Sequence, residues 1–181
     1  YSCVFFEKNY IGLLYFLLHS YVLYGEPSED IKYLIICDPL FSKEIKKICS
    51  NLNINTEIWC LKLTTKFEAG YCRLKIFEYT HINKFDKILY LDCDILVTNN
   101  LKNIFDITLE NKLYVLKEGN TNHVFWGKEF FQENNPNSVA FTSGILLFNN
   151  CSCIKKLFQN ILKHINEHLI QCKEIPLCLD Q

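Results

Sequence analysis

The sequence predicts an α/β fold in which a mainly parallel sheet carries helices on both faces, and three observations support this. The length of 181 residues suits one domain of ordinary size. Apolar runs of strand length alternate with helical patterns from one end of the chain to the other, as expected of βαβ units. The run Tyr33–Cys37 is apolar throughout, which is typical of a strand covered on both faces.

The first half of the chain contains the first strands and helices of this pattern. Cys3–Phe6 predicts a short strand. The apolar stretch Tyr10–Tyr24 falls short of the roughly 20 residues that span a bilayer, so it predicts a buried helix and no transmembrane segment. After the strand Tyr33–Cys37, Ser42 is expected to cap a helix. The apolar residues of that helix recur at i, i+3, i+4 and i+7: Ile45, Ile48, Cys49 and Leu52.

The second half continues the alternation. Glu57–Leu61 predicts a strand, Gly70 to about Thr80 a helix, and Lys87–Leu91 the central strand. Leu113–Leu116 and Phe141–Phe148 predict two more strands, and the polar segment 118–137 between them predicts a loop with a helical turn at 128–132. A long helix follows, with one apolar face made of Ile154, Leu157, Phe158, Ile161, Leu162, Ile165 and Leu169. The sequence contains no internal linker, so we expect a single domain over residues 1–181.

Composition excludes several classes of protein. Residues of the hydrophobic set make up 49% of the chain and the formal net charge is −1, which excludes a disordered tail. Nineteen Lys and Arg residues stand against 20 Asp and Glu residues, so the chain lacks the positive field of a basic nucleic-acid-binding module. Nucleic acid is therefore not an expected partner.

The ten cysteines are interpreted as free thiols. They include no Cys-x-x-Cys pair, the spacing that zinc sites usually need. Most lie in apolar runs such as Ile36-Cys37 and Trp59-Cys60, where a thiol acts as a small buried hydrophobe. Unpaired cysteines favour a cytoplasmic or cytosol-facing location. Because the chain lacks Met and runs from Tyr1 to Gln181, we interpret it as a piece of a longer product.

An acidic turn follows the central strand. Asp92 and Asp94, with Cys93 between them, come directly after Ile88-Leu-Tyr-Leu91, and ligands bind at the carboxyl edge of open α/β sheets. Two neighbouring carboxylates repel each other, a cost that a divalent cation usually offsets. Oxygen ligands select Mg²⁺ or Mn²⁺, which commonly bridge carboxylates to substrate phosphates. The alternative is an Asx-type turn in which both side chains bond to local backbone.

Several motifs together resemble glycosyltransferase family 8, the family of glycogenin and the bacterial lipopolysaccharide galactosyltransferases. The likeness covers nearly the whole chain, and the motifs occur in the family's order. They are Asn9-Tyr10 with Ser20 ten residues later, Gly70-Tyr-Cys-Arg73-Leu-Lys75-Ile-Phe-Glu78, Asp86 to Val97 around the acidic turn, Leu101 to Asp106, Phe141-Thr-Ser-Gly144-Ile-Leu-Leu-Phe-Asn149, and Leu179-Asp180-Gln181.

The resemblance implies a GT-A fold, that of the nucleotide-diphospho-sugar transferases, and retaining transfer of a hexose from a nucleotide sugar. The donor implied is UDP-linked and the cofactor Mn²⁺ or Mg²⁺, while the acceptor is a hydroxyl of a glycan or a protein, and a homodimer is left open. By resemblance, Asp92 and Asp94 hold the metal on the diphosphate, with Cys93 between them. The other implied donor contacts are Tyr10 on the base, Arg73 or Lys75 on the donor, and Thr142, Ser143, Gly144, Asp180 and Gln181 around the sugar, the last two with catalytic roles.

The chain departs from the family in several places. Glu7 lies in the nucleotide loop where a neutral Asn or Asp often appears, and the stretch between Arg73 and Asp92 is a residue or two longer than in close relatives. Thr142 stands where the family usually has Asn, and the family's third metal ligand, a histidine, is expected downstream of Gln181. Single residues also have structural alternatives: Tyr10 as a core aromatic, Arg73 as a surface residue paired with Glu78, Gly144 as relief of crowding within a strand, and Asp180-Gln181 as an unstructured end.

Two other functions compete with sugar transfer. A nucleotide-sugar-binding module without turnover would keep the same binding residues. A phosphatase of the haloacid dehalogenase type also places Asp-x-Asp after an apolar strand, with the first Asp as nucleophile. That motif usually has Thr or Val two residues after the second Asp, where this chain has Leu96, and it usually follows the first strand of the fold.

Overall fold

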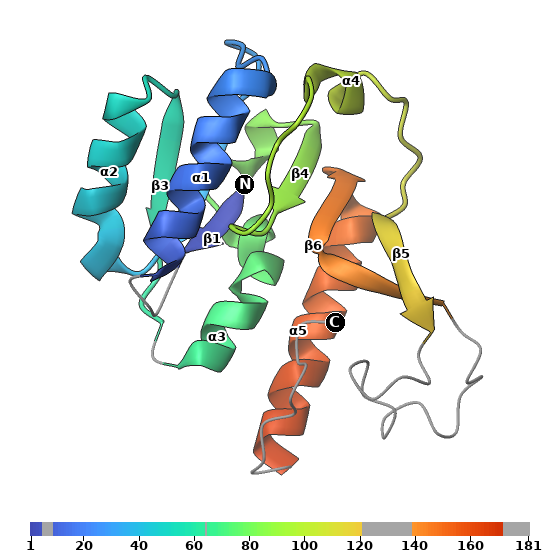
Figure 1. Ribbon diagram of the computed structural model, residues 1–181. Coiled ribbons are helices and arrows are strands. Elements are labelled where there is room, and N and C mark those ends of the chain that lie inside the picture. The colour runs from blue at the N-terminus through green and yellow to red at the C-terminus, as the bar shows by residue number, and fades with distance from the viewer. Residues whose placement is uncertain (5–8, 64, 121–138, 172–181) are drawn as a thin grey trace. The chain divides into compact units, whose positions relative to one another are not determined.

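The computed structural model describes residues 1–4, 9–63, 65–120 and 139–171 (Figure 1). Its contacts divide the chain into two compact units. Unit 1 comprises Tyr1–Arg73 and Tyr90–Glu110, and unit 2 comprises Leu74–Leu89 and Asn111–Gln181. A single domain over residues 1–181 stays a prediction. No helix within the described ranges is long and apolar enough to cross a membrane.

Unit 1 contains a parallel sheet of three strands in the order β1-β2-β3. The strands are β1 (Ser2–Val4), β2 (Tyr33–Cys37) and β3 (Thr56–Cys60). Every residue of β2 is buried, as its unbroken apolar sequence predicted. The strand predicted at Glu57–Leu61 begins and ends one residue earlier, and residues 5 and 6 of the predicted first strand lie outside the described residues.

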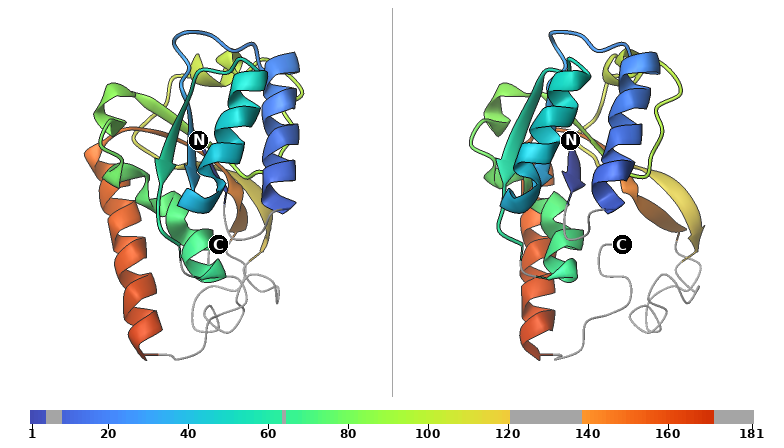
Figure 2. Two further views of the ribbon diagram at one scale, coloured as in Figure 1. Left: turned by 90° about the vertical axis from the view of Figure 1, so that its left-hand side faces the viewer. Right: turned by 60° about the vertical axis from the view of Figure 1, so that its left-hand side comes forward.

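Two helices lie side by side on one face of this sheet (Figure 2). They are α1 (Asn9–Tyr24) and α2 (Ser42–Asn51). The prediction that Ser42 caps α2 is wrong: Ser42 is the first helical residue, and its hydroxyl donates to the Pro39 carbonyl at 2.9 Å. The reason is that Asp38 starts a 3-10 turn, η1 (Pro39–Phe41), by accepting from the Leu40 amide at 3.0 Å. The chain is therefore already turning when it reaches Ser42.

The helix predicted from Gly70 to about Thr80 is also corrected. An α-helix, α3 (Lys66–Tyr71), begins four residues earlier, and a 3-10 helix, η2 (Cys72–Glu78), continues from it. The early start follows from a capping box at Thr65 and Glu68, in which each side chain bonds the other residue's backbone amide at 3.1 Å. A further 3-10 turn, η3 (Ile82–Lys84), and a four-residue helix, α4 (Lys102–Phe105), were not predicted.

A second sheet has the strand order β4-β6-β5. Its strands are β4 (Lys87–Leu91), β5 (Tyr114–Asn120) and β6 (Val139–Asn149), and the last two are longer than predicted. The β5–β6 pair is antiparallel, an exception to the mainly parallel sheet that we expected. Within unit 2, α5 (Ser152–Gln171) packs Phe158 against Phe148 and Phe77, with ring centroids 5.1 and 5.5 Å apart. The predicted helical turn at 128–132 lies outside the described residues.

Candidate functional site

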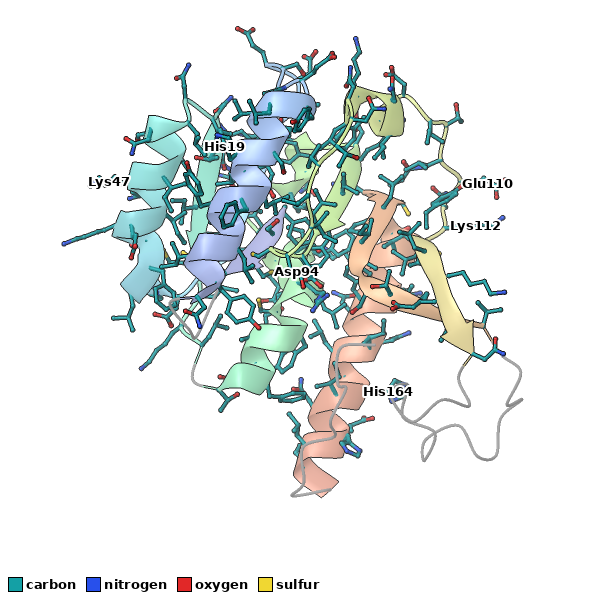
Figure 3. All side chains as sticks on the ribbon, viewed as in Figure 1. His19, Lys47, Asp94, Glu110, Lys112 and His164 are labelled. Atoms are coloured by element: carbon teal, nitrogen blue, oxygen red, sulfur yellow. The ribbon has the colours of Figure 1, made fainter. Side chains whose placement is uncertain are left out.

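The acidic turn follows the end of β4, as the sequence predicted. The backbone leaves the strand at Leu91 and turns at once, with the Ile95 amide donating to the Asp92 carbonyl at 3.2 Å. Asp92 is half-buried, whereas Asp94 is exposed (Figure 3). Asp94 is therefore open to a ligand from solvent, while Asp92 is partly covered by other side chains and still one-third exposed.

Helix α1 holds the far end of this turn through one buried serine. The Val97 amide donates to the Ser20 hydroxyl at 2.9 Å, and that hydroxyl donates to the Leu17 carbonyl at 2.8 Å. Ser20 is only 7% exposed, so this bond satisfies an amide that would otherwise lose its hydration. Ser20 entered the sequence analysis only as part of a family motif, and its link to the acidic turn could not be read from spacing.

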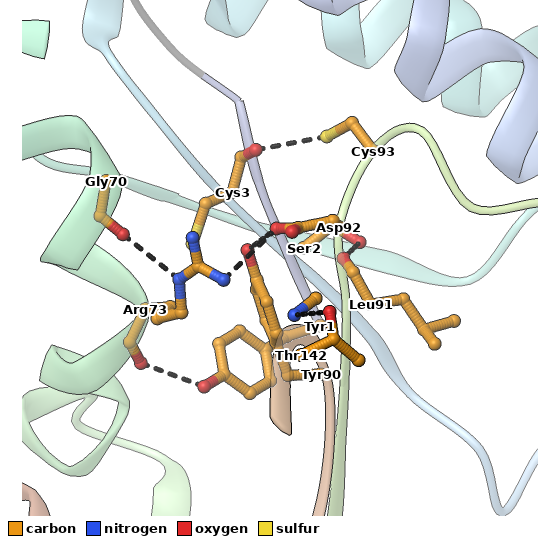
Figure 4. Close-up of polar contacts among 11 residues, drawn as sticks. Tyr1, Ser2, Cys3, Gly70, Arg73, Tyr90, Leu91, Asp92, Cys93 and Thr142 are labelled. Atoms are coloured by element: carbon orange, nitrogen blue, oxygen red, sulfur yellow. Dashed lines mark hydrogen bonds and ion pairs between the residues drawn. The ribbon is translucent and has the colours of Figure 1, made fainter. Parts of the chain in front are cut away.

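Arg73 is a buried partner of Asp92. Its Nη1 lies 3.4 Å from Asp92 Oδ1, and its Nε donates to the Gly70 carbonyl at 3.0 Å (Figure 4). The residue is only 5% exposed. A buried guanidinium needs a charged or hydrogen-bonded partner, and here Asp92 supplies one. The alternative that Arg73 is a surface residue paired with Glu78 is therefore wrong.

Two tyrosines complete this cluster, and sequence reasoning missed both of them. The Tyr90 hydroxyl donates to Asp92 Oδ1, and the Arg73 guanidinium carbon lies 4.8 Å from the centroid of the Tyr90 ring. The Tyr1 ring lies 4.9 Å from that of Tyr90, and the Tyr1 hydroxyl donates to the Arg73 carbonyl at 2.8 Å. Tyr90 could have been suspected, because it lies two residues before Asp92 at the end of β4, where alternate side chains of a strand share a face.

Burial keeps these phenols protonated. It raises the pKa of the Tyr90 hydroxyl well above its usual range, and the Asp92 carboxylate raises it further against the opposing effect of Arg73. Burial likewise raises the pKa of the Tyr1 hydroxyl. Tyr90 is therefore a hydrogen-bond donor to Asp92 at neutral pH. The carboxylate is held between a fixed positive charge and a fixed donor.

The Cys93 thiol turns away from the carboxylates into the core. It donates to the Cys3 carbonyl at 3.0 Å and is buried. Burial, together with Cys3 and the two aspartates, raises the pKa of Cys93, so the thiol stays neutral. A donor contact by Cys93, which the family resemblance implies, would therefore come from its backbone.

The remaining predicted site residues are described within their own units. Tyr10 is half-buried in the first turn of α1. Lys75, on η2, and Thr142, Ser143 and Gly144, on β6, belong to unit 2. There the Gly144 amide donates to the Thr142 hydroxyl at 3.2 Å, and Ser143 is buried. Asp180 and Gln181 lie outside the described residues. Of the predicted residues, the structure thus brings Arg73 and Asp92 into contact.

The two carboxylates suit a hard divalent cation. They offer oxygen ligands only, and within the described residues no three His, Cys, Asp or Glu side chains gather into a metal site. Mg²⁺ and Mn²⁺ are commonly held by one or two carboxylates plus the phosphates of a substrate. Asp92 and Asp94 fit that pattern and would depend on the substrate for further ligands.

Comparison with known proteins settles the family. The model described as glycosyl transferase family 8 matches residues 25–178. The chain belongs to glycosyltransferase family 8. Glycosyltransferase GlyA of Streptococcus pneumoniae serotype 4 (strain ATCC BAA-334 / TIGR4) is 28% identical over 159 residues, which cover 86% of this chain. The chain spans only 20% of the length of that relative.

Solved structures of glycosyltransferases share the fold of this family 8 chain. One is galactosyltransferase LgtC, solved with donor and acceptor sugar analogs, with a TM-score of 0.70 and 23% sequence identity. The match covers 99% of this chain and 68% of the LgtC chain. Another is the glycosyltransferase GlyE of Streptococcus pneumoniae TIGR4, with a TM-score of 0.61 and 18% sequence identity. That match covers 99% of this chain and 41% of the GlyE chain. The predicted GT-A fold is thereby confirmed.

Proposed function

We propose that this family 8 chain transfers a hexose, with retention, from a UDP-sugar to a hydroxyl of a glycan or a protein, and that it needs Mn²⁺ or Mg²⁺ to do so. The observation that carries the proposal is the acidic turn. Asp92 and Asp94 follow a strand of a GT-A fold, and a buried Arg73 lies 3.4 Å from Asp92. Family membership supports sugar transfer, and the carboxylate pair supports a donor that carries phosphate.

Asp92 and Asp94 would hold the cation on the donor diphosphate. When bound, the cation supplies Lewis acidity toward the negative charge that grows on the departing diphosphate. Arg73 contributes its own charge to the same region, and its contacts with Gly70 and Tyr90 fix it there before substrate arrives. Because these groups are already in place, little reorganisation is needed during the reaction.

The other roles follow the family resemblance. Tyr10 packs on the nucleotide base, and Arg73 contacts the donor, with Lys75 as the alternative for that contact. Thr142, Ser143 and Gly144 line the sugar. The sequence offers no obvious carboxylate nucleophile beyond Asp180. We favour attack of the acceptor hydroxyl on the same face from which the diphosphate leaves, with Gln181 positioning the sugar.

The test is release of UDP from a UDP-sugar by the intact protein in Mn²⁺. Asp94→Asn removes a charged ligand from an exposed side chain and is expected to reduce release by at least about a hundredfold. Asp106→Asn is the matched control, because Asp106 is also an exposed aspartate of unit 1 and is expected to leave release unchanged. Turnover that survives Asp94→Asn would show that the metal assignment is wrong.

Two outcomes of the same experiment would favour the competing functions. Metal-dependent binding of UDP without turnover would favour a nucleotide-sugar-binding module. An aspartyl-phosphate, the acyl phosphate formed on the Asp92 carboxylate, would favour the phosphatase if it were trapped.

A further inference from the structure

Two cysteines of unit 1 are direct neighbours at the ends of adjacent strands. Cys37 ends β2 and Cys60 ends β3, and the two residues are register partners in the parallel pair. Register partners point their side chains to the same face of a sheet, and neighbouring strands lie about 4.8 Å apart. That separation falls within the Cα range that a disulfide spans. Cys60 contributes to the raised pKa of the Cys37 thiol, so the two side chains interact.

The two thiols differ in their access to solvent. Cys60 is exposed, whereas Cys37 is 0% exposed. A small reagent in solution therefore meets Cys60 first, and Cys37 is shielded behind it. The pair differs from Cys3, Cys49, Cys72 and Cys93, which are buried thiols of the same unit. Within unit 1, our expectation of buried thiols thus holds for these four residues and for Cys37, and fails at Cys60; in unit 2 it fails at the exposed Cys153.

We propose that Cys60 and Cys37 form a thiol–disulfide exchange site for small disulfides such as oxidised glutathione. In the first step Cys60 loses its proton to water, its sulfur bonds to one sulfur of the small disulfide, and the other sulfur leaves and is protonated as a thiol. In the second step Cys37 loses its proton, bonds to the Cys60 sulfur, and releases the second small thiol. Two protein thiols are oxidised to one disulfide, and the small disulfide is reduced to two thiols.

The electrostatics of the pair agree with this order of steps. Burial, followed by the charge and hydrogen bond of Cys60 and the charge of Asp38, raises the pKa of Cys37 to about 12. Cys37 is therefore a neutral thiol in the reduced protein. Once the Cys60 sulfur is in a mixed disulfide it carries no charge, so that cause of the raised pKa is removed. Cys37 becomes easier to deprotonate at the step that needs it.

The backbone around the pair already joins the two strand ends. The Leu61 amide donates to the Cys37 carbonyl at 2.9 Å, and the Leu63 amide donates to the Asp38 carboxylate at 3.2 Å. The segments that a disulfide would link are thus held together in the reduced protein. The disulfide would add a covalent restraint at the carboxyl edge of this sheet without bringing distant segments together.

The experiment treats the full reduced chain with oxidised glutathione, blocks the remaining thiols and maps the peptides by mass. Trypsin releases residues 33–43 with Cys37, and cleavage after Glu57 separates Cys60, in residues 58–62, from Cys49. We expect these two peptides to be joined, and to separate on reduction. Cys153, exposed on α5, reports that the reagent is active in the same sample.

Two variants distinguish exchange from simple modification. Cys37→Ser removes the second thiol, so glutathione should stay on Cys60 and its occupancy there should rise at least tenfold over the wild type. Cys60→Ser should leave Cys37 neither linked nor glutathionylated. Glutathione that persists on Cys60 in the wild type, or a Cys60 that stays unmodified while Cys153 reacts, would overturn the proposal. The assay uses no nucleotide, so either failure leaves the proposed sugar transfer untouched.

Discussion

The surroundings of Arg73 are the feature of the site that the sequence left most open and the structure defines most clearly. Its place in a motif left open whether it is a surface residue or a buried one. The structure buries it between the Gly70 carbonyl, the Tyr90 ring and Asp92. Replacing Arg73 would leave Asp92 half-buried without this cation, so we regard the pair as one unit of the site. Lysine could not reproduce the arrangement, because it lacks the planar group that stacks and bonds in fixed directions.

Tyr90→Phe tests whether the surroundings of Asp92 matter for metal binding. The substitution removes the hydroxyl that donates to Asp92 and keeps the ring that contacts Arg73 and Tyr1. We expect the half-saturating Mn²⁺ concentration for UDP release to rise about tenfold, as is typical when a partner of a metal ligand is lost. The measurement is a Mn²⁺ titration of the initial rate.

Tyr33→Phe is the matched control for that titration. Tyr33 is also a buried tyrosine of unit 1, and its hydroxyl bonds to Ser2 at 2.7 Å. Each variant loses one hydrogen bond, so each should lose roughly 1 kcal/mol of stability. Tyr33→Phe should nevertheless leave the half-saturating Mn²⁺ concentration unchanged. Equal shifts in the two variants would mean that the Tyr90 hydroxyl acts through stability alone.

At the scale of elements, α1 supports the site, and its last turn is tightly packed. Gly25 follows the helix, and its amide donates to the Tyr21 carbonyl at 2.8 Å. A Cβ at Gly25 would lie 2.5 Å from Cδ2 of Tyr21 and 2.7 Å from the Tyr21 carbonyl oxygen. Tyr21 is itself only 1% exposed, so neither the ring nor the backbone can move aside without cost.

Gly25→Ala is therefore expected to lower the free energy of unfolding by about 1–3 kcal/mol. Gly12→Ala, within α1, is the control, because a Cβ at Gly12 meets nothing within 4 Å. It should leave stability unchanged or raise it by up to about 1 kcal/mol, since alanine favours a helix more than glycine does. Urea unfolding of both variants measures the difference. A Gly25→Ala variant as stable as Gly12→Ala would contradict the packing described here.

Elements with a strong apolar period were predictable from sequence, and short elements governed by hydrogen bonds were not. β2 and β4 have the bounds expected from their apolar runs. The start of α3 was missed because the capping box at Thr65 and Glu68 has no apolar signal. Ser42 was wrongly predicted to cap α2, because Asp38 already begins the turn that leads into this helix. Local polar bonding decided both boundaries, and periodicity does not detect it.

For the site, sequence supplied the chemistry and the structure supplied the contacts. Two carboxylates after a buried strand could be read directly. The contact of Arg73 with Asp92, and that of Ser20 with the Val97 amide, join residues 19 and 77 positions apart in the chain. Such contacts depend on how strands and helices pack, which no spacing rule encodes. The neighbouring thiols of Cys37 and Cys60 likewise depend on the register of β2 and β3.

At the scale of the whole molecule, buried thiol and phenol groups predict that the protein loses stability at alkaline pH. Burial raises the pKa of Cys37 from 9.0 to about 12 and raises the pKa of Tyr33 and Tyr90 above their usual value of 10.0. Above pH 9 the unfolded chain loses these protons while the folded chain keeps them. The unfolded state then binds fewer protons, so the free energy of unfolding falls as pH rises from about 9 to 12.

Urea unfolding at pH 8 and pH 10.5 checks this expectation. Each group that ionises only in the unfolded chain lowers the free energy of unfolding by up to about 1.4 kcal/mol per pH unit. Tyr33→Phe removes one such group and should make the fall with pH less steep. A free energy of unfolding that is the same at both pH values would contradict the protonated state assigned to these buried side chains.

The central claim is that Asp92 and Asp94 bind a divalent cation together with a nucleoside diphosphate. Calorimetric titration of the intact protein with UDP, in Mn²⁺ and again with a chelator, tests it most directly. We predict that the chelator weakens UDP binding at least tenfold, and that Asp94→Asn weakens it equally in the presence of Mn²⁺. Equal UDP affinity with and without Mn²⁺, or an Asp94→Asn variant that binds Mn²⁺ and UDP as the wild type does, would contradict the account.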